Sequence, residues 1–164
     1  LFDYASHVIN LIQEIIGKPV EARGSQLKKI YSKEVEDAVY SILKLESGLT
    51  DILSVNWSDE TYRKMSTSIT VIGEKGKMIC DATELKIYLR EADKENRFDK
   101  GWTIKYITEF AIPVDFYLRG EEYSAQIDYF VRNIISGRQP EINTFRQALD
   151  TDRVMELIVA DSKR

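Results

Sequence analysis

The sequence predicts an α+β domain, in which a run of antiparallel strands separates one N-terminal helix from two C-terminal helices. Apolar residues recur at helical spacing near both ends of the chain and alternate with period two in between. Two pairs of strand-like runs are joined by short turns containing glycine, which favours local antiparallel pairing. The chain has 164 residues, enough for one domain with its own core. We therefore expect a single domain over residues 1–164, with helices packed on one face of a largely antiparallel sheet.

The first predicted helix runs from about Asp3 to Ile16. Gly17 ends it, and Lys18-Pro19 follows as a second stop signal. Polar residues spaced by four, three and four positions occupy one face, and apolar residues form a separate stripe. The polar residues are Asp3, His7, Asn10 and Glu14, and the apolar ones are Val8, Leu11, Ile12, Ile15 and Ile16.

The middle of the chain, from Val20 to about Glu109, is predicted to be β-structure. Each predicted strand is rich in β-branched and aromatic residues and is bounded by turn signals. The first hairpin joins 37–46 to 49–57 through Ser47-Gly48, and the second joins 66–73 to 77–81 through 74–76. Further strands are expected at 85–90 and 102–108, with the charged loop 92–101 between them.

The end of the chain returns to helix. The segment from Glu121 to Ser136 carries an apolar face and closes at Gly137. A last helix begins at Thr144, where Gln147, three residues on, completes a capping box. The apolar positions of the first of these helices are Tyr123, Ile127, Phe130, Ile134 and Ile135, and those of the second are Ala148, Val154, Leu157 and Ile158.

Both faces of two predicted strands, 49–57 and 66–72, carry few charged residues. A face that meets water normally carries more charge than this. Because helices can cover one side of the sheet, we expect the other side to meet a partner subunit in a homo-oligomer. A Thr- and Ser-rich sheet exposed to solvent is the alternative.

Composition excludes several classes of function. A formal net charge of −4 argues against a general nucleic-acid binder, and no run approaches the roughly 18 apolar residues of a membrane span. Cys80 is the single cysteine, so a reducing, cytoplasmic setting fits best, and a buried structural thiol is the expected state of that residue. With one histidine and one cysteine, we expect no metal site.

No motif in the chain holds a nucleotide. Neither the dinucleotide-binding motif G-x-G-x-x-G nor the phosphate-binding motif G-x-x-x-x-G-K-[ST] occurs. Any redox chemistry therefore needs a cofactor that is bound outside these residues. Neighbouring acidic residues such as Glu34 with Asp37, or Asp59 with Glu60, are expected by chance among 27 carboxylates.

The residues with the clearest chemical meaning are Asp3 and His7. At a spacing of four on a helix, a carboxylate can orient an imidazole and tune it for proton transfer. Taken alone, the pair is more simply interpreted as a helix cap or a surface pair. The chain begins at Leu1 without an initiator Met, which suggests a catalytic half separated from its other half.

The order of several motifs resembles the C-terminal domain of the Gfo/Idh/MocA oxidoreductases. Asp3-Tyr-Ala-Ser-His7 is similar to the D-x-x-x-H opening of that domain, and the helix it begins ends in Ile16-Gly-Lys-Pro19. Family-like features then follow in order at 35–39 (V-E-D), 45–49 (a turn with Ser-Gly), 55–58 (a strand ending in Trp), 72–77 (G-x-x-G) and 129–154 (helix, turn, helix). The sequence departs from the family at Ala5, where Gly is frequent, and at Asn10, where Asp is frequent.

The resemblance implies a two-domain enzyme with an N-terminal Rossmann domain that binds NAD or NADP. This chain would be the C-terminal domain for substrate binding and oligomerisation, and no cofactor is expected on the chain alone. The family's catalytic set implies that His7 acts as general base with Asp3, together with a lysine from the missing domain. The fragment by itself is therefore expected to be inactive.

The implied substrate is a sugar, nucleotide-sugar or cyclitol hydroxyl. Candidate substrate-binding residues are Asn10, Trp57, Tyr62, Arg63 and Lys64, the last four an aromatic and cationic cluster after a predicted strand. Ordinary packing at the strand end and a solvated loop are the alternatives. Alternative functions are an NAD-dependent glycosidase of the same fold and a non-enzymatic dimerisation or ligand-binding module. We expect neither nucleic acid nor membrane as a partner.

Overall fold

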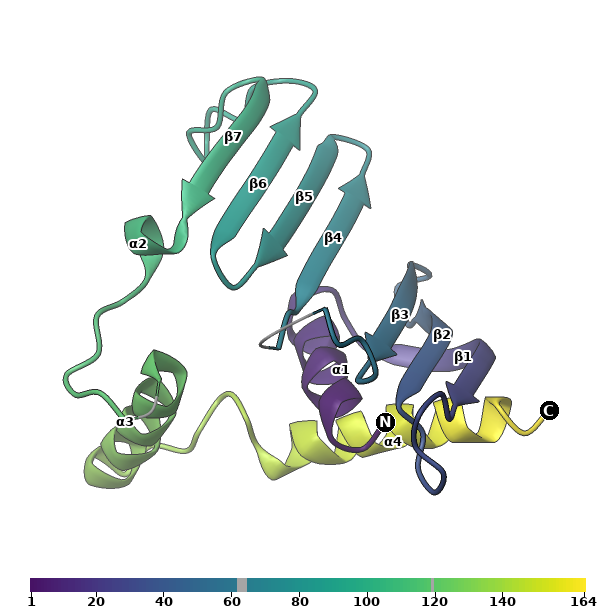
Figure 1. Cartoon of the computed structure of the whole chain (residues 1–164). Helices are drawn as coiled ribbons and strands as arrows, with labels where there is room; N and C mark the ends of the chain where they lie inside the picture. The colour runs from purple at the N-terminus through teal and green to yellow at the C-terminus, as the bar shows by residue number, and fades with distance from the viewer. Residues whose placement is uncertain (62–64, 119) are drawn as a thin grey trace. The chain divides into compact units, whose positions relative to one another are not determined.

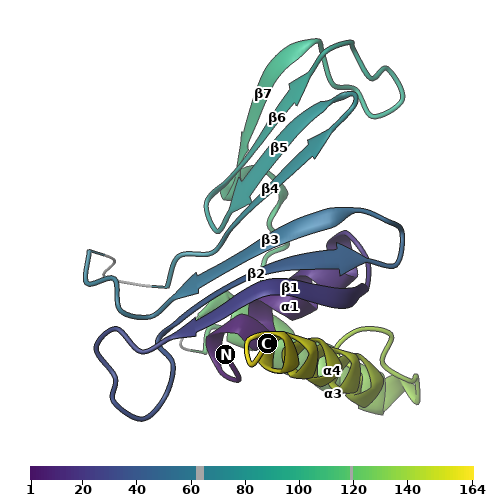
Figure 2. The ribbon, with the colours of Figure 1, turned by 90° about the vertical axis from the view of Figure 1, so that its right-hand side faces the viewer.

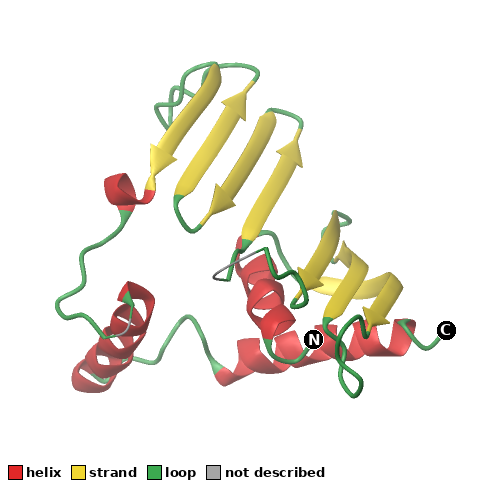
Figure 3. Cartoon of the chain, viewed as in Figure 1, coloured by secondary structure: helices red, strands yellow, loops and turns green. Residues whose placement is uncertain are grey.

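The computed structural model describes residues 1–61, 65–118 and 120–164. The chain falls into two compact units, one formed by Leu1–Thr61 with Asn133–Arg164, the other by Tyr62–Arg132. Within the described residues, loops join helices and two antiparallel sheets (Figure 3), so the α+β class is confirmed. The strands form two sheets, whereas one was expected from the sequence. Pairing between neighbouring hairpins is non-local, and the alternation within each strand does not encode it.

The first unit holds a three-stranded sheet in the order β1-β2-β3. Its helices are α1 and α4, and both lie on one face of the sheet (Figures 1 and 2). The elements are α1 (Tyr4–Ile15), β1 (Pro19–Lys28), β2 (Ala38–Leu45), β3 (Thr50–Asn56) and α4 (Phe145–Asp161).

The ends of α1 and α4 follow the signals in the sequence. Gly17 has a positive φ of 127°, and its N–H bonds the carbonyl of Ile12, which terminates α1 where predicted. Thr144 caps α4: its hydroxyl accepts from the N–H of Gln147, whose side chain in turn accepts from the N–H of Thr144. The predicted capping box is therefore confirmed.

Alternation within β2 and β3 decides which side chains enter the core. Leu43 on β2 and Leu53 on β3 point to the helices and are nearly fully buried, whereas Ile42 and Ile52 pair with each other on the opposite face and are exposed. Burial of the inward side chains is the main stabilising contribution to this unit. The core consists of Leu1, Ala5, Ile9, Ile12, Ala22, Val39, Leu43, Leu53, Val55, Val154, Met155 and Ile158.

The second unit holds a four-stranded antiparallel sheet in the order β4-β5-β6-β7. Its strands are β4 (Ser68–Gly73), β5 (Gly76–Asp81), β6 (Glu84–Leu89) and β7 (Gly101–Tyr106), followed by the four-residue helix α2 (Ile107–Phe110). The second hairpin and the two later strands are thus confirmed, while α2 falls at the end of the segment expected to be β.

Helix α3 (Glu121–Ser136) crosses the boundary between the two units. Its bounds agree with the prediction. The side chains of its apolar face are exposed: Tyr123, Ile127, Phe130, Ile134 and Ile135.

One expectation about this sheet is wrong. Cys80 was expected to be a buried thiol, yet its side chain is exposed on β5. It lies opposite Ile69 and Leu85, on the apolar face that strand alternation defines. Alternation identifies the face but does not determine whether another element covers it.

No helix within the described residues is both long enough and apolar enough to span a bilayer.

Candidate active site at the start of helix α1

The two residues expected to carry out proton transfer lie at the start of α1. Asp3 occupies the N-cap position and His7 lies within the helix, four residues on. Both side chains are exposed. The Asp3 carboxylate makes no capping hydrogen bond, which argues against the alternative that it serves only as a helix cap. Within the described residues no hydrogen bond or ion pair joins Asp3 to His7, so both groups are open to an incoming molecule.

The far end of the same polar face is occupied by another helix. Glu14 accepts a hydrogen bond from the side-chain amide of Gln147 on α4. Asn10, between His7 and Glu14, is half-buried. The polar face of α1 therefore has two parts: its C-terminal end contacts α4, and its N-terminal end, with Asp3 and His7, faces solvent.

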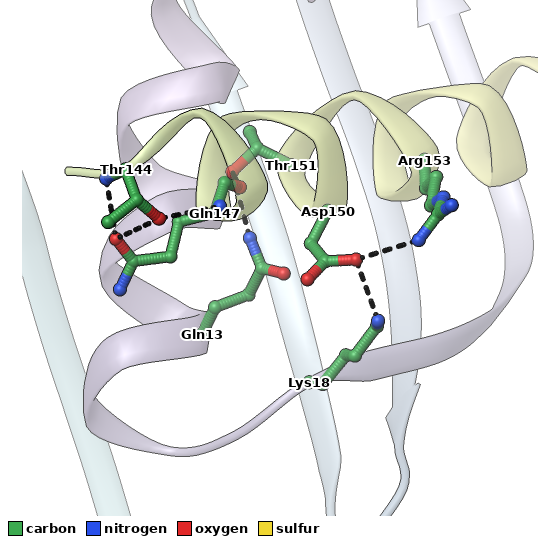
Figure 4. A network of polar contacts seen from close by, with 7 residues as sticks. All are labelled: Gln13, Lys18, Thr144, Gln147, Asp150, Thr151 and Arg153. Atoms are coloured by element: carbon green, nitrogen blue, oxygen red, sulfur yellow. Dashed lines mark hydrogen bonds and ion pairs between the residues drawn. The ribbon is translucent and has the colours of Figure 1, made fainter. Parts of the chain in front are cut away.

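A polar network holds the C-terminal end of α1 against α4 (Figure 4). The Gln13 amide donates to the Thr151 hydroxyl at 2.8 Å. Just beyond the helix, the Lys18 ammonium bonds the Asp150 carboxylate at 2.8 Å and holds the pKa of that carboxyl below its usual range. These contacts fix the direction of α1 and therefore the position of its open N-terminal end.

Trp57 is brought to the start of α1 by the end of β3. Its indole ring lies edge-on to the Tyr4 ring, with 5.2 Å between ring centroids and 83° between ring planes. The indole remains 65% exposed. One predicted substrate-binding residue thus lies beside the helix turn that carries Asp3 and His7. Of the other four, Asn10 lies on α1 itself, and Tyr62, Arg63 and Lys64 lie outside the described residues.

The loop before β2 is held by a carboxylate that the sequence did not single out. Asp37 accepts hydrogen bonds from the backbone N–H groups of Ile30, Tyr31 and Ser32, each at 2.7 Å. The Asp37 carbonyl also accepts from the N–H of Trp57 at 2.7 Å. A polar run followed by Asp is a weak signal of such a turn, since a carboxylate can accept several backbone donors. Asp37 therefore joins this loop to the Trp57 end of β3.

These backbone donors lower the pKa of Asp37, with Ile30 contributing most. A carboxyl whose pKa is lower in the folded than in the unfolded state stabilises the fold above the unfolded value of about 3.9. That stability is lost as the pH falls through the folded value. We expect Asp37→Asn to lower the free energy of unfolding at neutral pH, and the deficit relative to the unmodified chain to shrink on acidification towards pH about 3. Urea titrations across this range test the prediction, and a deficit independent of pH would contradict it.

The pKa of Asp51 is shifted in the opposite direction to that of Asp37. Burial raises the pKa of Asp51, whose Oδ2 atom is buried without a hydrogen-bond partner among the described residues. It lies at the start of β3, five residues before Asn56, a distance of roughly 17 Å along an extended strand. Asp51 therefore belongs to the other end of the sheet from Trp57.

The arrangement suits proton transfer at an open surface. An exposed imidazole can accept a proton from a hydroxyl, and a carboxylate one helical turn away can stabilise the resulting cation. No three His, Cys, Asp or Glu side chains gather closely enough to hold a metal ion in the part of the chain that the structure describes.

A comparison with protein families identifies the N-terminal part of the chain. Residues 1–79, which include Asp3, His7 and Trp57, match the family described as GFO/IDH/MocA C-terminal domain. The family expected from the sequence is therefore confirmed over these residues. No curated protein sequence matches the chain.

Solved structures share the fold of almost the whole chain. Levoglucosan dehydrogenase in complex with NADH and levoglucosan has a TM-score of 0.80 and 16% identity, with 98% of this chain and 47% of that chain covered. An oxidoreductase from Agrobacterium radiobacter in complex with NAD+, L-tartaric acid and magnesium has a TM-score of 0.74 and 17% identity, with 99% and 46% covered. The WlbA dehydrogenase from Bordetella pertussis, in complex with NADH and UDP-GlcNAcA, has a TM-score of 0.64 and 20% identity, with 97% and 41% covered. The chain spans less than half the length of each of these proteins.

Proposed function

We propose, from the premise that residues 1–79 carry a GFO/IDH/MocA C-terminal domain, that this chain is the substrate-binding part of an NAD(P)-dependent oxidoreductase. Its substrate is a sugar, nucleotide-sugar or cyclitol hydroxyl. The observation that carries the proposal is the open, uncapped Asp3 beside His7 inside the matched segment. The similar solved structures, each more than twice as long as their match to this chain, support a second part that holds the cofactor.

The 164 residues do not fit a dinucleotide site of their own, because they contain no glycine-rich phosphate-binding fingerprint. The cofactor therefore belongs to the other part of the enzyme, where it would accept a hydride from the substrate carbon. The contribution of this chain is proton transfer and binding. His7 takes the hydroxyl proton as general base, and Asp3 orients the ring and balances its charge.

Binding of the substrate is assigned to the surface next to these residues. Asn10 lies one turn further along the polar face of α1, and Trp57 contacts Tyr4, the first residue of the same helix. An exposed indole suits the apolar face of a sugar ring. Tyr62, Arg63 and Lys64 remain candidates that follow Trp57 in the chain.

The proposed assembly is a homo-oligomer through an open sheet face. On the face of the first sheet opposite the helices, Tyr40, Ile42 and Ile52 are exposed, the last by 76%. Exposed apolar side chains grouped on one face support a contact with another copy of the protein. A cytoplasmic location, which the single exposed cysteine suits, completes the proposal.

A turnover assay tests the proposed function. The protein that includes both this chain and its cofactor-binding part is incubated with NAD+ or NADP+ and a panel of levoglucosan, L-sorbose, myo-inositol and UDP-GlcNAcA. We expect reduced cofactor to form with at least one member of the panel, and no turnover by residues 1–164 alone. Cofactor binding without turnover on any member would contradict the proposal. Cleavage of a glycoside without net cofactor reduction would favour the glycosidase instead.

A further inference from the structure

Tyr4 lies on α1 between the side of the helix that carries His7 and the core of the first unit. It is the first residue of the helix, so its neighbours one turn on are His7 and Val8. His7 is exposed, whereas Val8 is packed against the core, and Tyr4 is itself partly buried against the same core. Tyr4 is therefore held on one side by the core and lies next to His7 on the other.

The backbone of Trp57 is fixed on both sides. Its own N–H donates to the Asp37 carbonyl, which continues the pairing of β2 with β3 by one residue. Immediately after it, the N–H and hydroxyl of Ser58 both donate to the Asn56 side-chain oxygen at 2.7 Å. With the backbone held in this way, the remaining freedom of the indole is rotation about its side-chain bonds. The edge-to-face contact with Tyr4 restricts that rotation.

The exposure of Trp57 distinguishes this contact from ordinary packing. An aromatic side chain that serves the core is expected to be buried, yet this ring is 65% exposed while it is held by a partner. Another aromatic pair in the described part of the chain, Tyr88 with Trp102, has a simpler explanation. These two residues are directly opposite each other on β6 and β7, so strand register alone brings them together. Tyr4 and Trp57 come from a helix and a strand end that are far apart in the sequence.

We propose that Tyr4 is a positioning residue for substrate binding. Its ring holds the Trp57 indole beside the helix face of Asp3 and His7, so that the free part of the indole can take the C–H face of a sugar ring. This inference rests on the proposed function. It assigns to Tyr4 a role that acts through Trp57 and does not involve proton transfer.

Fluorescence tests the contact without any need for activity. In a Trp102→Phe background, Trp57 is the only tryptophan of the chain. We expect Tyr4→Leu to shift the Trp57 emission to longer wavelength and to lower its anisotropy, because the indole gains solvent and rotational freedom. Tyr4→Phe, which keeps the ring, should leave both quantities unchanged. Unchanged emission and anisotropy in Tyr4→Leu would overturn the inference.

Kinetics test the role. With the panel sugar that gives the highest kcat/KM, we expect Tyr4→Leu to raise KM about 3- to 10-fold, as the loss of an aromatic contact implies, with kcat unchanged. Tyr4→Phe should restore KM. Trp57→Leu should raise KM to at least the same extent, and adding Tyr4→Leu to it should have no further effect, because both variants remove the same contact.

Tyr88→Leu is the matched control, because it breaks the aromatic pair of Tyr88 with Trp102 and should change neither KM nor kcat. A fall in kcat with an unchanged KM in Tyr4→Leu, or an equal effect of Tyr88→Leu, would overturn the positioning role. If no panel sugar is turned over by the unmodified protein, the proposed function fails, and the fluorescence result alone decides whether Tyr4 holds Trp57.

Discussion

Replacement of His7 by alanine is expected to lower kcat by about 10²- to 10⁴-fold in the protein that carries its cofactor-binding part, because the variant loses the general base. The affinity for NAD(P) should be unchanged, since the cofactor is assigned to residues outside this chain. His7 is exposed on α1, so its removal leaves no cavity in the core. Steady-state kinetics and cofactor titration, measured on the same preparation, test both parts of this expectation.

The role of Asp3 can be separated from that of His7. Asp3→Asn keeps the size of the side chain and removes its charge, and because the Asp3 carboxylate makes no capping hydrogen bond, the helix start should not be weakened. We expect a loss of kcat smaller than that of His7→Ala, since the imidazole remains and only its orientation and charge balance change. The kcat of the double variant should be close to that of His7→Ala.

Glu14→Ala is the matched control for these variants. Glu14 lies on the same polar face of α1, but its carboxylate is engaged by Gln147 of α4, away from the open end of the helix. Its replacement should change kcat by less than about twofold, the order expected of a substitution outside the reacting groups. A kcat that is undiminished in His7→Ala, or a loss of cofactor affinity that matches the loss of turnover, would remove His7 from the proposed role.

Local patterns predicted the elements of the fold well. The helix expected at about residues 3–16 is Tyr4–Ile15, and the capping box at Thr144 forms as expected. These features depend on residues within one or two turns of each other, so sequence spacing is enough to define them. The division of the strands into two sheets and the exposure of Cys80 depend on elements that are far apart in the chain. Spacing alone contains no information on those contacts.

The site shows the same limit at the scale of single residues. The spacing of Asp3 and His7 predicts that both lie at the start of one helix, and in the structure Asp3 is the N-cap of α1 and His7 lies within it. The edge-on contact of Tyr4 with Trp57 and the carbonyl that Asp37 offers to Trp57 could not be predicted, because each joins segments at least 20 residues apart. Spacing was therefore enough to propose Asp3 and His7 for proton transfer, whereas the structure was needed to find what surrounds them.

The position of the site depends on the core beneath α1, which leads to the largest expected effect on stability. Ile9 is fully buried between the sheet and α4, and Ile15, on the same helix, is 58% exposed. Ile9→Ala should lower the free energy of unfolding by about 2–5 kcal/mol, because it removes buried methyl and methylene groups and leaves a cavity. Ile15→Ala should change it by no more than roughly 0.5 kcal/mol, as expected of a surface substitution.

The comparison isolates burial, because both variants make the same chemical change and gain the same helix propensity. Unfolding in urea can be followed by Trp57 fluorescence in the Trp102→Phe background, which reports on the unit that contains α1. Equal destabilisation by the two variants would mean that α1 is not packed on the sheet through Ile9. The packing of Ile9 positions α1 and therefore Asp3, His7 and Tyr4 at its start. A loss of stability confined to Ile9→Ala would show that the core beneath Ile9 holds this end of the helix in place.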